Sequence, residues 1–245
     1  MKDIRILISI ITLLIAGFTA NAQEYKELWL VGSAVPGSAQ KMEKTPDGYF
    51  RYNGALSVGS LKVQTTSIVT ADTEWLVPQA EDAQAINHGI NYLSSTDSAS
   101  SSIYVPIPSS HYRLTVSPQK GKINGEIFRP WHELYLVGGA TPNGWDVYNA
   151  ISLTQDENNP YLWSWTGELK PHSEYVGASE FKFLGFRTYG QREIHPFYAN
   201  ADVLKTTKVR PLTGVDTKWV LRKPGRYHIT LDLFHETIKA KYLGE

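Results

Sequence analysis

The chain has 245 residues, with 24 basic and 24 acidic side chains and no cysteine. A zero net charge gives no support to a polyanion such as nucleic acid as a partner. The lack of cysteine excludes disulfides and leads us to expect no lipid anchor attached through a thiol, so an exported protein of this composition relies on its hydrophobic cores.

Residues 1–22 have the pattern of a secretory signal peptide. Lys2 and Arg5 precede an apolar run over residues 6–18, and Ala20-Asn21-Ala22 offers a cleavage site of small residues. The apolar run is shorter than the about 20 residues that a membrane-spanning helix needs. We therefore expect export to the periplasm, the outer membrane or the exterior, with no transmembrane segment in the mature chain.

The remainder of the sequence contains two copies of one plan, which predicts two domains. Leu28-Trp29-Leu30-Val31-Gly32 resembles Leu134-Tyr135-Leu136-Val137-Gly138, and both runs continue through Ala to Pro. Three further pairs follow in the same order: residues 50–56 with 163–169, 61–63 with 181–183, and 112–116 with 227–231. We predict a first domain over residues 23–128 and a second over residues 129–245.

Alternation of apolar and polar residues predicts strands throughout both copies. Tyr227, Ile229 and Leu231 share one face of a predicted strand, and the alternation returns through Ile238 after a turn. That pattern indicates a hairpin, and no helical periodicity of useful length is present. Many short strands separated by Gly, Pro, Asn and Asp turns predict an all-β protein of two tandem Ig-like antiparallel β-sandwich domains after a signal peptide.

Sequence motifs for catalysis are absent. The chain has no Gly-x-Ser-x-Gly elbow, no His-Glu-x-x-His, no phosphate-binding glycine loop and no cysteine nucleophile, and His132 beside Glu133 does not have metal-ligand spacing. We expect a protein that is not an enzyme, without metal or cofactor. A small glycosidase stays open as an alternative, because its pair of carboxylates is assembled in space rather than in sequence.

Trp145 is the aromatic residue whose position most favours binding. It lies in Thr141-Pro142-Asn143-Gly144-Trp145-Asp146, a turn-rich connection, and loops are where binding residues concentrate. An apolar ring flanked by polar groups suits stacking against the C–H face of a pyranose. The alternative is that Trp145 folds back and covers the edge of its own sandwich.

Lys182 and the loop that follows it are further candidates. Lys182 alternates with Phe181 and Phe183, so its ammonium group points outward if the two rings point inward. There it either donates to sugar hydroxyls or is an ordinary solvated lysine. The loop over residues 187–192 adds an aromatic ring at Tyr189 and a planar donor at Arg192, a mixture that suits vicinal hydroxyls.

Residues 134–146, followed by Trp163-Ser164-Trp165-Thr166-Gly167-Glu168-Leu169 and by Glu180-Phe181-Lys182-Phe183-Leu184, resemble the carbohydrate-binding modules of the SusE/SusF family of bacterial starch-utilisation systems. The match covers most of residues 130–245. The resemblance implies a non-catalytic β-sandwich that binds α-glucans such as starch and maltooligosaccharides. It also implies the site residues: Trp145 for the Gly-Trp ring, Lys182 for the Phe-Lys-Phe lysine, and Tyr189 and Arg192 for the variable loop.

The first copy departs from this pattern. Residues 33–42 contain no Trp, although Lys62 is kept and Trp75 lies near the corresponding loop, so the first domain has either lost binding or binds differently. We predict a carbohydrate-binding protein of a polysaccharide-utilisation system, with outer-membrane glycan-uptake proteins as candidate partners. The alternative is an exported structural or interaction protein that docks to an outer-membrane partner through the same aromatic loop.

Overall fold

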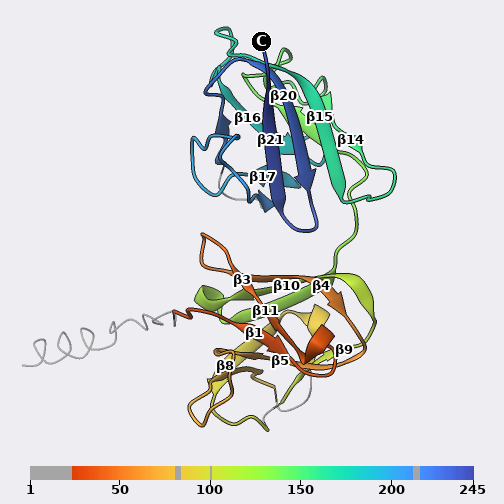
Figure 1. Ribbon diagram of the computed structural model, residues 1–245, viewed down its shortest axis with the longest axis vertical. Helices are drawn as coiled ribbons and strands as arrows, with labels where there is room; N and C mark the ends of the chain where they lie inside the picture. The colour runs from red at the N-terminus through yellow and green to blue at the C-terminus, as the bar shows by residue number, and fades with distance from the viewer. Residues whose placement is uncertain (1–23, 81–83, 100, 212–215) are drawn as a thin grey trace, which may run out of the picture.

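A computed structural model describes residues 24–80, 84–99, 101–211 and 216–245. Figure 1 shows two halves, one above the other along the long axis, joined by the segment between β11 and β12. The regular structure in the described residues is strand, apart from three 3-10 helices of three residues each. The predicted all-β class is confirmed, whereas the predicted signal peptide lies outside the described residues.

The strands of the first half form a single 11-stranded sheet whose path runs β2-β1-β5-β6-β8-β11-β10-β4-β3, with β7 and β9 off the path. The strands are β1 (Trp29–Val31), β2 (Ala39–Lys41), β3 (Glu43–Lys44), β4 (Phe50–Leu56), β5 (Gly59–Gln64), β6 (Trp75–Pro78), β7 (Gln84–Ala85), β8 (Ile90–Ser95), β9 (Ile103–Val105), β10 (Ser109–Ser117) and β11 (Lys122–Ile127). The three short helices are η1 (Pro36–Ser38), η2 (Ile86–His88) and η3 (Pro118–Lys120).

This sheet folds over a core of its own. Leu30 of β1 and Val63 of β5 belong to the same buried cluster as Phe50 of β4 and Leu114 of β10, although these strands lie far apart along the path of the sheet. Strands distant along the path therefore face one another across the cluster, which is the arrangement of a β-sandwich.

The second half contains two sheets, β13-β12-β16-β17-β18 with β19 beside β16, and β14-β15-β20-β21. The strands are β12 (Tyr135–Val137), β13 (Ile151–Ser152), β14 (Thr154–Gln155), β15 (Leu162–Leu169), β16 (Glu180–Leu184), β17 (Glu193–His195), β18 (Arg210–Pro211), β19 (Trp219–Val220), β20 (Gly225–Asp232) and β21 (Thr237–Gly244). Phe181 and Phe183 of the first sheet meet Trp163 and Ile229 of the second in one buried cluster. Every second residue of β20 is buried, the others are half-buried or exposed, and the strand pairs with β21, so the predicted hairpin is confirmed.

The first strand of each half has the same pairing and is followed by the same type of residue. Val31 pairs with Lys62 in the first half, and Val137 pairs with Lys182 in the second. A glycine follows in each copy, Gly32 in the first and Gly138 in the second. Gly138 has a positive φ of 149°, and a Cβ there would lie 2.2 Å from the Glu180 carbonyl oxygen. Only glycine allows this close backbone approach. The shared geometry supports the repeat; the division at residues 128 and 129 stays a prediction.

A buried ionic contact joins the halves. Arg113 of β10 donates from Nη2 to the Leu233 carbonyl oxygen at 2.6 Å, and its Nε lies 3.3 Å from Glu236 Oε1. Arg51 of β4 approaches the other oxygen of Glu236 at 3.7 Å. The Arg113 guanidinium lies 3.8 Å from the centre of the Phe128 ring, which packs in a cluster with the rings of His111, Tyr161 and Phe234. Within the described residues, no helix has the length and apolar character needed to cross a membrane.

Candidate functional site

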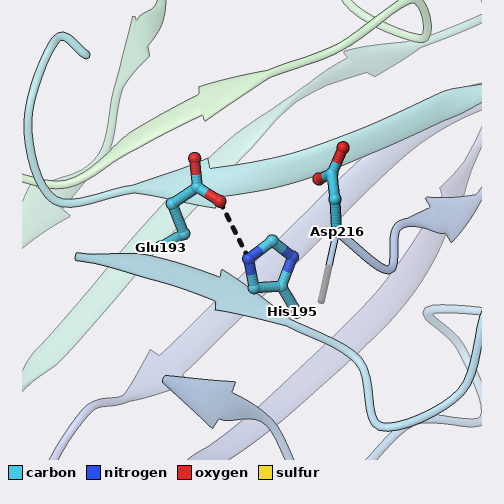
Figure 2. A group of neighbouring side chains, drawn as sticks. All are labelled: Glu193, His195 and Asp216. Atoms are coloured by element: carbon cyan, nitrogen blue, oxygen red, sulfur yellow. Dashed lines mark hydrogen bonds and ion pairs between the residues drawn. The ribbon is translucent and has the colours of Figure 1, made fainter. Parts of the chain in front are cut away.

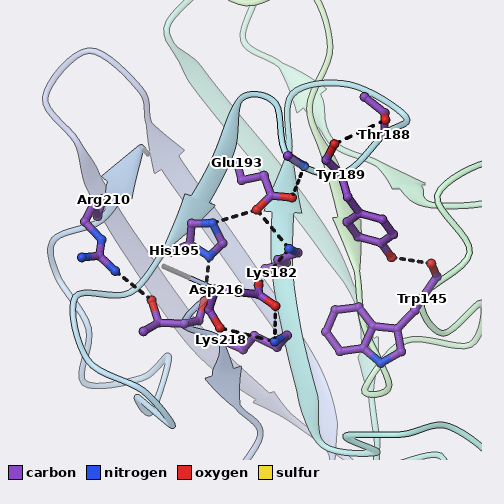
Figure 3. Close-up of polar contacts among 11 residues, drawn as sticks. Trp145, Lys182, Thr188, Tyr189, Glu193, His195, Arg210, Asp216 and Lys218 are labelled. Carbon is purple, nitrogen blue, oxygen red and sulfur yellow. Dashed lines mark hydrogen bonds and ion pairs between the residues drawn. The ribbon is translucent and has the colours of Figure 1, made fainter. Parts of the chain in front are cut away.

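A cavity of about 580 Å³ opens in the second half, between the loop after β12, the loop before β17 and the residues that lead into β19. Its lining residues are Trp145, Lys182, Tyr189, Gly190, Glu193, Asp216 and Lys218. Figure 3 shows the two aromatic rings on one side and the charged groups on the other. Three of the four predicted site residues, Trp145, Lys182 and Tyr189, thus line one cavity.

Trp145 is held by its own loop. The Gly138 N–H donates to the Gly144 carbonyl at 2.8 Å, and the Thr141 hydroxyl donates to the Gly138 carbonyl at 2.8 Å, which fixes the turn before the indole. The Trp145 Nε1–H donates to the Val176 carbonyl at 2.7 Å. Trp145 is half-buried and packs on a small cluster that includes Val137 and Leu184. One part of the indole is therefore anchored, while another part faces the cavity.

Tyr189 supplies the second ring. Its hydroxyl donates to the Trp145 carbonyl oxygen, so the two aromatic loops are tied together. The Lys182 Nζ lies 4.9 Å from the centre of the Tyr189 ring, a cation–π distance. Burial, with smaller contributions from the charges of Glu193 and Asp216, raises the pKa of the Tyr189 hydroxyl above its ordinary value. Tyr189 as a whole is 43 % exposed and lines the cavity.

Lys182 is not the ordinary solvated lysine that is one of the two alternatives from the sequence. Phe181 and Phe183 are fully buried and Lys182 projects from the opposite face, as predicted, but only 4 % of Lys182 is exposed. Its Nζ lies 3.0 Å from Glu193 Oε2 and 2.9 Å from Asp216 Oδ1. The ammonium is buried because two carboxylates compensate its charge, so it forms the floor of the cavity.

The exposed Asp216 and the half-buried Lys218 form the rim of the cavity. Lys218 Nζ lies 2.6 Å from Asp216 Oδ2 and 5.6 Å from the centre of a Trp145 ring. Partial burial alone would raise the pKa of the Asp216 carboxyl, but hydrogen bonds from Lys218 and Lys182 and their charges outweigh it and hold the pKa below its usual value. Asp216 is therefore an ionised acceptor at neutral pH, and its side chain is 58 % exposed.

His195 lies behind the floor of the cavity. Its Nδ1 lies 2.7 Å from the Thr217 carbonyl oxygen, to which it donates, and its Nε2 lies 3.0 Å from Glu193 Oε2. Burial lowers the pKa of His195, and the nearby Lys182 charge adds to the shift. The ring sits between the strand that carries Glu193 and the segment that carries Asp216 (Figure 3).

Glu193, His195 and Asp216 are also the described residues whose ligand atoms gather closely enough to hold a metal ion, within 4.8 Å of one another (Figure 2). The Lys182 ammonium contacts both of these carboxylates. It thus takes the place next to the carboxylates that a metal cation would need, and His195 Nδ1 is already engaged with a backbone carbonyl. The donor set therefore fits a buried ionic network better than a metal centre.

Arg192 does not share this cavity. It has a left-handed φ of 37°, and its guanidinium lies 5.8 Å from the centre of the Trp131 ring and 4.8 Å from that of Phe186. It lines a different cavity, next to residues 126–131. The neighbouring Glu193 side chain reaches both cavities.

Sequence reasoning missed Glu193, Asp216 and Lys218. The alternation of Glu193 and His195 around the apolar Ile194 was a usable signal, because it places two polar side chains on one face of a strand. No local signal marks Asp216, which lies 34 residues from its partner Lys182.

The first half lacks the same network. In the second half, the residue two positions after Lys182 pairs with Glu193 on the next strand. In the first half, the residue two positions after Lys62 pairs with Trp75. Trp75 therefore occupies in the first half the position that Glu193 holds in the second. Trp75 is 7 % exposed, and Lys62 Nζ lies 6.0 Å from its ring centre. A buried indole replaces the acidic floor of the cavity.

Comparison with known proteins gives little further identification. No family model matches the chain, and no curated protein matches it. Among solved structures, one match is the crystal structure of SusF from Bacteroides thetaiotaomicron, with a TM-score of 0.40 and 13 % identity over 90 % of this chain and 49 % of that chain. The chain spans about half the length of that protein, and membership of the SusE/SusF family stays a prediction.

Proposed function

We propose that the cavity in the second half binds a carbohydrate. The observation that carries this proposal is that two aromatic rings, Trp145 and Tyr189, flank a cavity whose other walls are hydrogen-bonding groups. Aromatic faces stack on the C–H surfaces of sugar rings, while polar groups placed at fixed positions orient the hydroxyls. The cavity volume of about 580 Å³ lies within the range of small-molecule sites.

The charges of the cavity favour a neutral sugar. Lys182 and Lys218 are matched by Glu193 and Asp216, so the lining carries no excess charge. The exposed Asp216 carboxylate accepts hydrogen bonds and the Lys218 ammonium donates them, which is the pair of functions that vicinal hydroxyls require. Together with the sequence resemblance to starch-binding modules, these features favour an α-glucan, held by an exported protein of a polysaccharide-utilisation system.

We also propose that binding occurs without catalysis. A glycosidase needs one carboxylic acid that stays protonated to protonate the leaving oxygen. In this cavity Lys182 lies between Glu193 and Asp216 and contacts both, and the pKa of Asp216 is held low. Such ion pairing supports fixed acceptors rather than a proton donor.

Affinity electrophoresis of the purified protein tests the proposal. Native gels that contain amylopectin, glycogen or pullulan are expected to retard the protein, whereas dextran, whose main chain has different linkages, is expected to retard it less. A folded protein that migrates identically in all gels would contradict α-glucan binding. Retardation by another neutral polysaccharide alone would keep a carbohydrate site but change its ligand, and sugar release from any of them would overturn the non-catalytic assignment.

A further inference from the structure

A second cavity lies where the two halves meet. Its volume is about 460 Å³, and residues of both halves and of the segment that joins them line it, among them Arg113, Glu126, Arg129, Trp131 and Arg192. Three arginine residues thus line one cavity. The first cavity, by contrast, has balanced charges and no arginine.

Two of these guanidinium groups have no acceptor in the part of the chain that the structure describes. Arg113 is committed to the Leu233 carbonyl and to Glu236. The Arg192 guanidinium makes ring contacts only, and the Arg129 side chain has no hydrogen bond or ion pair with a described residue. Both side chains are exposed. The donors of Arg129 and Arg192 are therefore free for a ligand.

The acidic residues that line the second cavity do not neutralise the charges of Arg129 and Arg192. Glu193 is engaged elsewhere, since its Oε2 contacts Lys182 and His195 and its Oε1 accepts the Gly190 N–H at 3.0 Å. Glu126 is then the one acidic lining residue that forms no ion pair with a described residue, against two free arginines. The cavity keeps an excess of positive charge, which favours an anionic ligand.

Arg192 is also held in place before any ligand arrives. A φ of 37° is costly for a residue with a side chain, and strained backbone of this kind concentrates at functional sites. The Arg192 guanidinium also lies within cation–π distance of the Trp131 and Phe186 rings. A planar fork that is fixed in this way matches the two oxygens of a carboxylate.

From this geometry we infer a second binding site at the junction, which takes a carboxylate-bearing ligand between Arg129 and Arg192. It is independent of the neutral glucan site, because no arginine and neither aromatic ring is shared; Glu193 is the common wall. The carboxylate can belong to a uronic-acid sugar or to a simple organic acid, and the two sources share the same recognition chemistry.

Calorimetric titration of the purified protein with glucuronate, acetate and glucose tests this site. We expect saturable binding of glucuronate that weakens as NaCl rises, and no binding of glucose at the junction. Arg192→Gln and Arg129→Gln are each expected to weaken glucuronate binding at least about tenfold, the effect of losing one charge-assisted contact. Arg222→Gln, the same change at an exposed arginine bonded to Asn200, is the matched control. Trp145→Ala is expected to leave glucuronate binding unchanged.

Acetate binding with the same dependence on Arg192 would keep the carboxylate site and assign it to organic acids. No saturable binding of either anion, or equal affinities in the wild type and both arginine variants, would overturn the proposal. If Arg192→Gln fails to fold, Arg129→Gln, at an exposed position outside any strand, still decides the question. Loss of glucuronate binding in Trp145→Ala would place the anion in the first cavity and overturn the proposal. The glucan site is tested separately by titration with maltoheptaose, so its failure and the failure of the junction site are distinguishable.

Discussion

Lys182 on β16 and Glu193 on β17 are ion-pair partners across neighbouring strands, with Nζ and Oε2 3.0 Å apart and both side chains almost fully buried. Strand alternation places Lys182 on the face opposite Phe181 and Phe183. Because of the ion pair with Glu193, the lysine is buried on that face and forms part of the floor of the cavity. The ammonium compensates two carboxylates at once, because Asp216 approaches it from the far side.

Lys182→Met is therefore expected to lower the free energy of unfolding by about 3–5 kcal/mol, since it leaves a buried carboxylate without its cation. Lys218→Met removes the other ammonium of the cavity, which pairs with the exposed side of Asp216, and is expected to cost about 1 kcal/mol or less. Urea denaturation of both variants measures the difference. Equal losses would contradict the buried role of Lys182.

Glu236 is expected to stabilise the contact between the two halves. Glu236→Gln leaves the buried Arg113 without its counter-charge and should lower the unfolding free energy by about 3 kcal/mol. Glu43→Gln is the control, because the Lys208–Glu43 pair also joins the halves at 2.7 Å but lies on the surface, and it should cost less than about 1 kcal/mol. Thermal unfolding compares them, and a Glu43 effect as large as that of Glu236 would contradict the assignment.

The buried His195 gives the protein a pH-dependent stability. Because burial lowers the pKa of the folded ring below its ordinary 6.5, the unfolded chain takes up the proton first as the pH falls. The contribution of His195 to stability is thus complete above pH 6.5 and is lost between 6.5 and the lower pKa of the folded state. An NMR titration of the ring protons should show this lowered pKa; a value at or above 6.5 would contradict burial as the dominant influence on the ring.

The Tyr189 hydroxyl ties the second aromatic loop to the Trp145 backbone. Tyr189→Phe keeps the ring but removes this hydrogen bond, which is worth about 1 kcal/mol. Glucan binding is expected to weaken by about two- to tenfold, because the Trp145 loop is then held less firmly. Titration of this variant with a maltooligosaccharide measures the change in affinity. A loss of binding as complete as that caused by removing the whole Tyr189 ring would contradict this role and show that the hydroxyl itself contacts the sugar.

Much of the fold follows from alternation and repetition in the sequence. The equivalence of residues 28–32 and 134–138 anticipates the shared pairing of Val31 with Lys62 and of Val137 with Lys182. Alternation also places Lys182 opposite Phe181, because the side chains of a strand point to opposite faces in turn. These are properties of neighbouring residues, and they need no knowledge of the tertiary structure.

The burial of Lys182 and the direction of Arg192 could not be read in this way. The partner Asp216 lies 34 residues away, so the compensating charge becomes visible only when the loops have been placed in space. Arg192 lies three residues from Tyr189 in the predicted loop, yet its left-handed backbone helps to place its side chain over Trp131, beside the other cavity. Charge compensation and loop conformation, rather than strand periodicity, thus decide the composition of the site.

The most direct test of a glucan site on Trp145 is calorimetric titration of maltoheptaose into the wild type, Trp145→Ala and Tyr148→Ala. Tyr148 is 79 % exposed in the same loop region but does not line the cavity, which makes it the matched aromatic control. We predict saturable binding to the wild type and to Tyr148→Ala, and at least about tenfold weaker binding to Trp145→Ala, as expected for an aromatic anchor. Equal affinities in all three proteins, or no binding to a folded wild type, would contradict this site.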